Sequence, residues 1–484
     1  MRSSLILFIM VLFSVATKAQ ECDCLVEFRF VKSHMEKNHP GFNSDIKSPE
    51  DKTYRKFVRS LEKSINKDKQ SKYCRAYILK YINYLKDHHS NYYASSRNVV
   101  ENNPDSLKAF LASPVFTGTE KAEVDSAAVM KYLKSLKQPG IEGIYTSSDG
   151  TYTVALLKNK KSHRDYYGLI LASKTPLWVK GQVKLELKEN GGNSLDAYIF
   201  MRNHSLNFEP WKLRNGQLLN SGWKKVYPAA AELAIDQSIN NDGIISFKVL
   251  DDSTSMISIR SFGGQFSAQL DSAYKKIIPE ISKYPNLIID VRNNGGGSDA
   301  NYRSLMPLLY TDTIFYDFVE MFVTAENKKA YEDIRDVAKK DTVNWGRDGW
   351  RNWQYRITQM DGKPFGSYVA ISNPGAYRTF QPIKGNPVKV AILYNNKTAS
   401  SAEQLIIDAG YSKKTILVGE NSGGYIAYGN VMDIQTPCGN LLNWTTTRKN
   451  KDRKYEFVGI TPHYKVPDNE TNWVEYTRKL LQSK

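Results

Sequence analysis

Short apolar runs that alternate with helix-forming segments, in the second half of the chain, restrict its fold more than any other feature. The runs Leu287–Val291, Val388–Tyr394 and Thr415–Val418 are mostly apolar, and a helix is expected to begin near Ser400, between the last two. Apolar runs of this length, separated by helices, are typical of strands that are buried on both faces of a sheet. Residues 241–484 are therefore expected to form an α/β core.

Residues 311–385 interrupt this core between its two halves. The stretch is polar and rich in aromatic residues, among them Trp345, Trp350 and Trp353. We interpret it as an insertion, which either covers a functional site or forms an ordinary surface excursion.

Two further regions precede the core. In residues 21–135, apolar residues recur at steps of three and four, most clearly between Cys74 and Leu85, which predicts an N-terminal helical domain. Residues 136–240 contain short, partly alternating runs rich in Tyr, Val and Thr, separated by turns such as Asp149-Gly150. This pattern predicts a β-rich module, either an antiparallel sheet or a barrel.

Residues 1–20 have the pattern of a secretory signal peptide. A basic residue precedes an apolar run from Leu5 to Ala16, and small residues follow at Thr17 and Ala19. The run is shorter than the roughly 20 residues that a membrane-spanning helix needs. We expect the mature protein to be secreted or periplasmic, with no membrane span.

The cysteines are too few to build a scaffold of disulfides. A chain of 484 residues with four cysteines must rely on a buried apolar core. Export permits oxidation, so one bridge from the pair Cys22 and Cys24 to Cys74 is expected. The spacing of the cysteines and histidines matches no metal-binding pattern, and we expect neither a metal nor another cofactor.

The chain is basic, but its charges are dispersed. It has 67 Lys and Arg residues against 50 Asp and Glu residues, a formal charge of +17. No run of five like charges occurs, which favours solubility and a weak attraction to anionic surfaces or acidic peptides over binding of nucleic acid.

A glycine-rich loop follows the first of the apolar runs. The sequence from Arg292 to Gly297 contains Gly295, Gly296 and Gly297 in succession. Glycines allow backbone N–H groups to approach a ligand closely, as in an oxyanion hole or an anion cradle. The same residues are also common in ordinary turns.

A serine-rich segment lies at the start of the helix near residue 400. Its sequence is Thr-Ala-Ser-Ser-Ala-Glu, from Thr398 to Glu403. A serine hydroxyl at a helix N-terminus lies beside unpaired N–H groups that stabilise developing negative charge. Alternatively, Ser400 or Ser401 simply caps the helix, and Glu403 completes a capping box with Ser400.

Taken together, these motifs resemble the tail-specific and C-terminal processing serine peptidases. The order is a strand and a Gly-Gly-Gly loop, the serine segment and its helix, then Gly419-Glu420 with Gly423-Gly424, and near the end Gly-Ile-Thr-Pro from Gly459. The resemblance implies a crotonase-like α/β core, with Ser400 as the nucleophile. It also implies an oxyanion hole made by Gly295, Gly296 and the amide of Ser401. We recognise no PDZ domain; residues 136–240 stand in its place.

The expected base is a histidine. The processing peptidases use a lysine where this chain has Tyr425, and tyrosine accepts protons poorly near neutral pH because its usual pKa is about 10. The tricorn-like branch is closer, since it uses a histidine late in the helical region and a glutamate near the C-terminus. The matching residues are His89 and Glu456, and Asp408 is a rival for the carboxylate that orients the histidine.

The sequence therefore predicts an exported serine peptidase that acts on a peptide or protein substrate. Two alternatives remain open: a catalytically idle relative that binds peptides, and a carboxylic esterase that uses the same site. The sequence gives no indication of the oligomeric state.

Overall fold

The computed structural model describes residues 23–45, 50–68, 71–94, 99–137, 140–161, 163–214, 216–219, 221–228, 238–239, 243–316, 318–371, 375–467 and 469–483. The predicted signal peptide and Cys22 lie outside these residues. Within the described part of the chain, every helix is too short or too polar to cross a bilayer.

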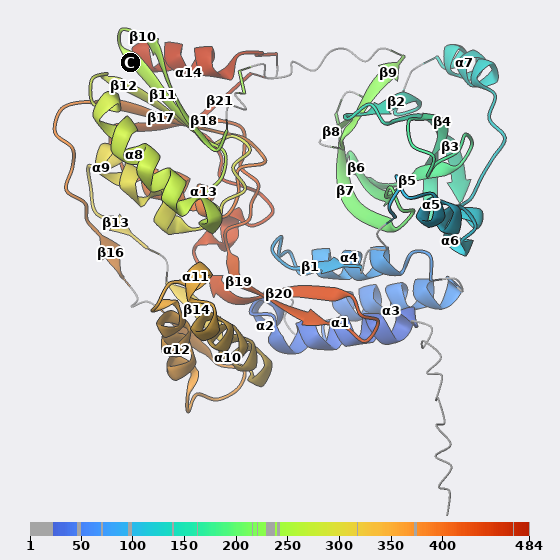
Figure 1. Ribbon diagram of the computed structural model, residues 1–484, viewed down its shortest axis with the longest axis horizontal. Helices are drawn as coiled ribbons and strands as arrows, with labels where there is room; N and C mark the ends of the chain where they lie inside the picture. The colour runs from blue at the N-terminus through green and yellow to red at the C-terminus, as the bar shows by residue number, and fades with distance from the viewer. Residues whose placement is uncertain are drawn as a thin grey trace, which may run out of the picture.

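Helices make up most of the first part of the chain, drawn in blue and teal in Figure 1. Asp23 and Asp51 accept hydrogen bonds from first-turn N–H groups of the helices that follow them, which the helices themselves leave unpaired. A disulfide joins Cys24, the first residue of the first helix, to Cys74, the first residue of the fourth helix, as expected. The helices are α1 (Cys24–Asn38), α2 (Phe42–Asp45), α3 (Lys52–Lys67), α4 (Cys74–Tyr84), α5 (Pro104–Leu111), α6 (Pro114–Thr117) and α7 (Ser126–Ser135).

An antiparallel sheet of eight strands follows, in the order β8-β7-β6-β5-β4-β3-β2-β9. It curls round so that its two end strands approach each other, as Figure 1 shows. Val154 and Leu187 are among the side chains fully buried inside it. The strands are β2 (Gly143–Ser147), β3 (Tyr152–Lys161), β4 (Arg164–Ser173), β5 (Val183–Gly191), β6 (Ser194–Phe200), β7 (Leu206–Arg214), β8 (Gln217–Leu219) and β9 (Trp223–Tyr227).

A six-stranded sheet in the order β10-β11-β12-β17-β18-β21 forms the α/β core. All its pairings are parallel except that of β10 with β11. Leu287 and Ile289 of β12 pack with α8 and α13 on one face, and Ile288 packs with α14 on the other. The strands are β10 (Ile245–Asp251), β11 (Thr254–Ile259), β12 (Asn286–Asp290), β17 (Lys389–Tyr394), β18 (Thr415–Gly419) and β21 (Tyr464–Lys465), and the helices are η1 (Gly264–Phe266), α8 (Ser267–Ile281), η2 (Asp299–Leu305), α9 (Met306–Leu309), α13 (Ser401–Ala409) and α14 (Trp473–Gln482).

A second, antiparallel sheet contains strands from three distant parts of the chain. β1, which follows the N-terminal helices, pairs with β20 through Asn91 and Asn443, and β20 pairs in turn with β14 of the 311–385 segment. The strands of this sheet are β1 (Asn91–Tyr93), β14 (Val319–Phe322), β15 (Tyr368–Ala370), β19 (Tyr428–Gln435) and β20 (Leu441–Lys449). β13 (Ile314–Phe315) and β16 (Tyr377–Arg378) form a separate two-stranded sheet. The helices of this part are α10 (Ala325–Lys340), α11 (Thr342–Trp345), α12 (Gly349–Met360) and η3 (Asp452–Tyr455).

Candidate active site

Ser400 lies at a strained turn between β17 and α13. Its φ of 55° is in the left-handed region, which is uncommon for non-glycine residues. Thr398 fixes the turn by donating its hydroxyl to the carbonyl of Val291 (2.8 Å), at the end of the neighbouring strand. The turn puts Ser400 at the N-terminus of α13, where the first N–H groups have no carbonyl partner within the helix.

Glu403 connects the serine turn to the loop after β18. Its carboxylate is buried and accepts hydrogen bonds from the N–H of Ser400 (3.0 Å), the hydroxyl of Ser422 (2.5 Å) and the N–H groups of Gly424 and Tyr425 (both 2.8 Å). Burial raises the pKa of this carboxyl. The sequence suggested only a capping box; the links to residues 422–425 connect segments that no local pattern could relate.

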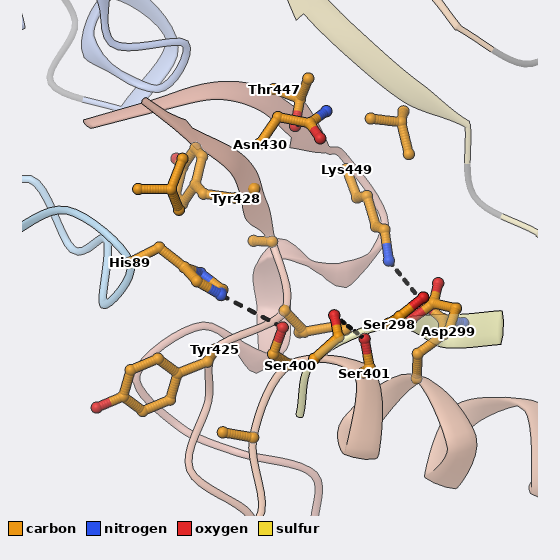
Figure 2. Close-up of a pocket in the computed structure, with 18 of the residues that line it drawn as sticks. His89, Ser298, Asp299, Ser400, Ser401, Tyr425, Tyr428, Asn430, Thr447 and Lys449 are labelled. Carbon is orange, nitrogen blue, oxygen red and sulfur yellow. Dashed lines mark hydrogen bonds between the residues drawn. The ribbon is translucent and has the colours of Figure 1, made fainter. Parts of the chain in front are cut away.

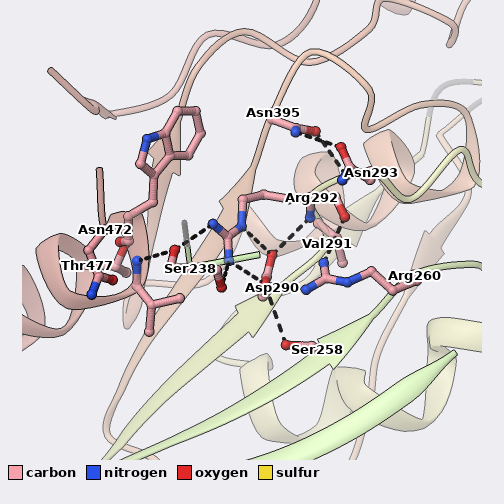
Figure 3. Close-up of polar contacts among 12 residues, drawn as sticks. Ser238, Ser258, Arg260, Asp290, Val291, Arg292, Asn293, Asn395, Asn472 and Thr477 are labelled. Atoms are coloured by element: carbon pink, nitrogen blue, oxygen red, sulfur yellow. Dashed lines mark hydrogen bonds and ion pairs between the residues drawn. The ribbon is translucent and has the colours of Figure 1, made fainter. Parts of the chain in front are cut away.

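His89 reaches Ser400 from the N-terminal region. Its Nε2 lies 3.4 Å from the Ser400 Oγ, although 311 positions separate the two residues (Figure 2). Catalytic hydrogen bonds are often this long before substrate binds. Burial lowers the pKa of the His89 imidazole below its ordinary value; the charge of Asp87 opposes this shift and that of Lys449 adds to it. This shift favours the neutral imidazole near pH 7, which is the form that can accept a proton from Ser400.

Asp87 holds the segment that carries His89. Its carboxylate is fully buried and accepts hydrogen bonds from the N–H of His89 (2.8 Å) and the hydroxyls of Ser90 (2.6 Å) and Thr445 (2.8 Å). Burial acts to raise the pKa of Asp87, but the hydrogen bond and charge of His39, helped by His89, hold it well below its usual range. The sequence does not single out Asp87; the available signal is its position next to a pair of histidines at a helix end.

Glu456 lies in the site but does not contact the ring of His89. The Nδ1 of His89 is buried and has no hydrogen-bond partner among the described residues, so the predicted carboxylate contact at this atom is absent from that part of the chain. Glu456 instead accepts hydrogen bonds from the N–H of His88 (3.2 Å) and from those of Ile426 (3.0 Å) and Ala427 (2.8 Å). Burial, together with the charge of Asp87, raises the pKa of Glu456 to about 8 against the effect of these amides.

Asp408, the other candidate for the carboxylate that orients His89, makes its hydrogen bonds to other residues. It accepts hydrogen bonds from the hydroxyls of Tyr302 (2.9 Å) and Tyr316 (3.2 Å) and from the side-chain amide of Gln404 (2.9 Å). Burial raises its pKa. These contacts anchor α13 to the core, and the interpretation of Asp408 as the residue that orients His89 is wrong for this geometry.

Tyr425 packs against both histidines. Its ring lies 4.2 Å from that of His88 and makes an edge contact at 5.8 Å with that of His89. Burial raises its pKa further above the usual value of 10, so its phenol cannot serve as a base near neutral pH.

The glycine loop lies beside the serine turn, but its three glycines differ. Gly296 has a φ of 92°, and a β-carbon built there would lie 2.7 Å from the Cβ of Ser400 and 2.8 Å from the N of Ser401. Its N–H already donates to the side-chain oxygen of Asn294 (2.9 Å), so the expectation that this amide is free to bind an oxyanion is wrong. Gly295 lines the cleft and faces open space there. Ser401 contributes a first-turn N–H, and its hydroxyl donates to the carbonyl of Gly297 (3.0 Å).

The cleft above these residues has a volume of about 1250 Å³. His89, Ser400 and Ser401 form part of its floor, as Figure 2 shows. The 311–385 segment supplies part of its wall, including Tyr316, Arg356 and Arg378. The segment that interrupts the core in sequence thus borders the candidate site.

Comparisons with known proteins give a family match and a set of similar structures. Residues 253–466 match peptidase family S41, and a search of curated proteins found no match. Structures similar to this chain include mature CPAF (14% identity, 95% of this chain and 96% of that chain, TM-score 0.48). They also include a putative peptidase from Parabacteroides merdae (12%, 95% and 97%, 0.41) and a photosystem II D1 C-terminal processing protease (11%, 92% and 93%, 0.35). The TM-scores lie below 0.5, so the assignment rests on the family match. Residues 253–466, which contain Ser400 and its helix, match peptidase family S41, and on this match the chain is a serine peptidase.

Proposed function

We propose that this protein is an exported serine peptidase in which Ser400 is the nucleophile and His89 is the base, as in the tricorn-like branch of the family. The contact of 3.4 Å between the Nε2 of His89 and the Oγ of Ser400 carries the proposal. A neutral imidazole beside a serine hydroxyl at a helix N-terminus is the arrangement that acyl transfer requires. The disulfide between Cys24 and Cys74 supports export, because such bonds persist in oxidising compartments.

The reaction follows from these positions. The Oγ of Ser400 attacks the carbonyl carbon of the scissile peptide bond while the Nε2 of His89 takes the hydroxyl proton. The N–H groups of Ser401 and Gly295 stabilise the oxyanion. His89 then gives its proton to the leaving amine, the C–N bond breaks, and an ester to Ser400 remains. Water, deprotonated by His89, hydrolyses that ester and restores the serine.

Two carboxylates keep His89 in place through the backbone. Asp87 accepts from the N–H of His89, and Glu456 accepts from the N–H of His88. In this proposal Glu456 is a positioning residue, since it acts through the segment 87–89 and not through the imidazole itself.

Labelling with a fluorophosphonate tests the nucleophile. The mature wild-type protein should carry the label on Ser400, and Ser400→Ala should lose both the label and about a thousandfold in kcat. Ser401→Ala is the matched control, because it keeps the backbone amide and loses only the hydroxyl that donates to Gly297. A label on Ser401, or a wild-type protein that neither labels nor turns over peptides, contradicts the proposal; turnover of esters alone would identify an esterase.

A further inference from the structure

The charged side chains that line the active-site cleft are almost all cationic. The lining contains one carboxylate, that of Asp299, and five cationic side chains: Arg303, Arg356, Arg378, Lys397 and Lys449. Lys449 donates to the side-chain oxygen of Gln404 (2.6 Å), and its ammonium lies 3.8 Å from Asp452. Among the described ion pairs, none involves the three arginines or Lys397. The cleft therefore carries an excess of positive charge that the chain itself leaves largely uncompensated.

Arg356 is the most informative of these cations. It projects from α12 of the 311–385 segment, and its guanidinium stacks over the ring of Trp353 at 5.1 Å. Its Nε and Nη1 are buried and have no hydrogen-bond partner among the described residues. The side chain nevertheless lines the cleft, so its charge acts on a ligand bound there.

Arg378 occupies a comparable position on β16. Its guanidinium lies over the ring of Tyr316, 4.2 Å from the centroid, and Tyr316 is itself fixed by a hydrogen bond from its hydroxyl to Asp408 (3.2 Å). Tyr316, which also hydrogen-bonds to the guanidinium, holds this charge against one wall of the cleft.

We propose that the 311–385 side of this cleft binds carboxylates of the substrate, so that the enzyme prefers acidic peptides. The inference rests on the proposed function and names the substrate class of that site. Arginine guanidiniums pair with carboxylates through short, charge-assisted hydrogen bonds, and the nearest lysines add to the attraction. The carboxylate belongs either to Asp and Glu side chains or to the C-terminus of the peptide, because the two present the same chemistry.

Binding to the Ser400→Ala protein tests the proposal without turnover. Fluorescent peptides of equal length contain three Glu, three Gln or three Lys residues, each made with a free and with an amidated C-terminus. The Glu peptides should bind about tenfold more tightly than the Gln peptides, which corresponds to about 1.4 kcal/mol, and Lys peptides should bind least. The difference should shrink as the salt concentration rises from 0.05 to about 0.5 M, because surface charges are screened.

Charge-removing variants locate the binding groups. Arg378→Gln and Arg303→Gln, each in the Ser400→Ala background, should reduce the preference for Glu over Gln several-fold; Arg356→Gln should do the same if it remains folded. Lys276→Glu on the exposed face of α8, away from the cleft, is the control and should leave the preference unchanged.

The outcomes separate the two sources of the carboxylate. A preference that survives amidation assigns the site to side chains, and one that disappears on amidation assigns it to the C-terminus. Equal binding of Glu and Gln peptides with both kinds of terminus overturns the inference. Labelling of Ser400 in the wild-type protein is measured separately, so a failure of the charge preference is distinct from a failure of the proposed function.

Discussion

His39 and Asp87 form a buried pair directly behind the segment that carries His89. The Nε2 of His39 lies 3.0 Å from the Oδ2 of Asp87, and neither side chain is exposed. The N–H of Gly41 donates to the Nδ1 of His39 (3.1 Å), so the proton of the ring lies on Nε2 and is donated to Asp87. The other oxygen of Asp87 accepts from the N–H of His89, which links the position of the proposed base to His39.

Asp87→Asn should lower kcat by at least about tenfold, with a smaller change in KM, because it weakens the support of His89 and not the cleft. The charge of Asp87 raises the pKa of His89, so its removal should also move the acid limb of the pH–kcat/KM profile to lower pH. Asp433→Asn, at an exposed position on β19, should change neither. An unchanged pH profile with reduced activity would indicate a purely structural role for Asp87.

The wild-type pH profile should itself report a histidine. Only the neutral imidazole can take the Ser400 proton, so kcat/KM should fall as the pH drops through the pKa of His89. Because burial lowers that pKa, the midpoint should lie below the ordinary value of 6.5. His89→Ala should abolish this limb together with most of the activity. His88→Ala, which loses stacking on Phe457 (3.6 Å) but keeps its backbone N–H to Glu456, should cost mainly stability.

Gly296→Ala should inactivate the enzyme, whereas Gly295→Ala should not. A β-carbon at Gly296 would lie 2.6 Å from the carbonyl oxygen of Ala399 and would also strain a positive φ, so the serine turn must shift. We expect a loss of at least a hundredfold in kcat and of about 2 kcal/mol in stability. The β-carbon of Gly295→Ala meets open space, and the amide is retained. Thermal denaturation and steady-state kinetics of both variants check this, and equal behaviour would contradict the close approach of the two loops.

Glu456→Gln should change how stability depends on pH. The pKa of Glu456 is raised to about 8 in the folded protein from 4.5, so the folded state binds more protons than the unfolded state between these values. Its contribution to the free energy of unfolding therefore falls as the pH rises through this window, by at most about 1.4 kcal/mol per pH unit. Denaturant unfolding at pH 5 and pH 8 should show the wild type losing stability relative to Glu456→Gln. A constant difference between the two proteins would contradict the raised pKa.

The strands and the serine helix of the core could be predicted because each has a local pattern. Leu287–Val291 and Val388–Tyr394 are apolar runs of strand length, and the structure has β12 and β17 there. Ser400 and His89 were singled out by family motifs, and the structure brings their side chains together.

The supporting contacts could not be predicted in the same way. His39 pairs with Asp87 and Glu403 with Ser422 and Gly424 through the folding of separate segments, and no periodicity in one segment encodes its partner in another. Small differences in atomic position also decide which hydrogen bonds form. Among the described residues, the Nδ1 of His89 has no partner, and the N–H of Gly296 donates to Asn294. A motif names residue types and their order, but it does not give the atom that each one contacts.

The pairing of β1 with β20 joins the segment that carries the proposed base to a strand that is synthesised late. Residues 91–93, which directly follow His89, are held by residues 441–443, and Glu456 follows later still. A nascent chain that has emerged only as far as α13 already contains the whole serine turn, yet the strand that fixes the base has not been made. In the proposed mechanism, the active site is therefore complete only when the last tenth of the chain has folded back onto the first fifth.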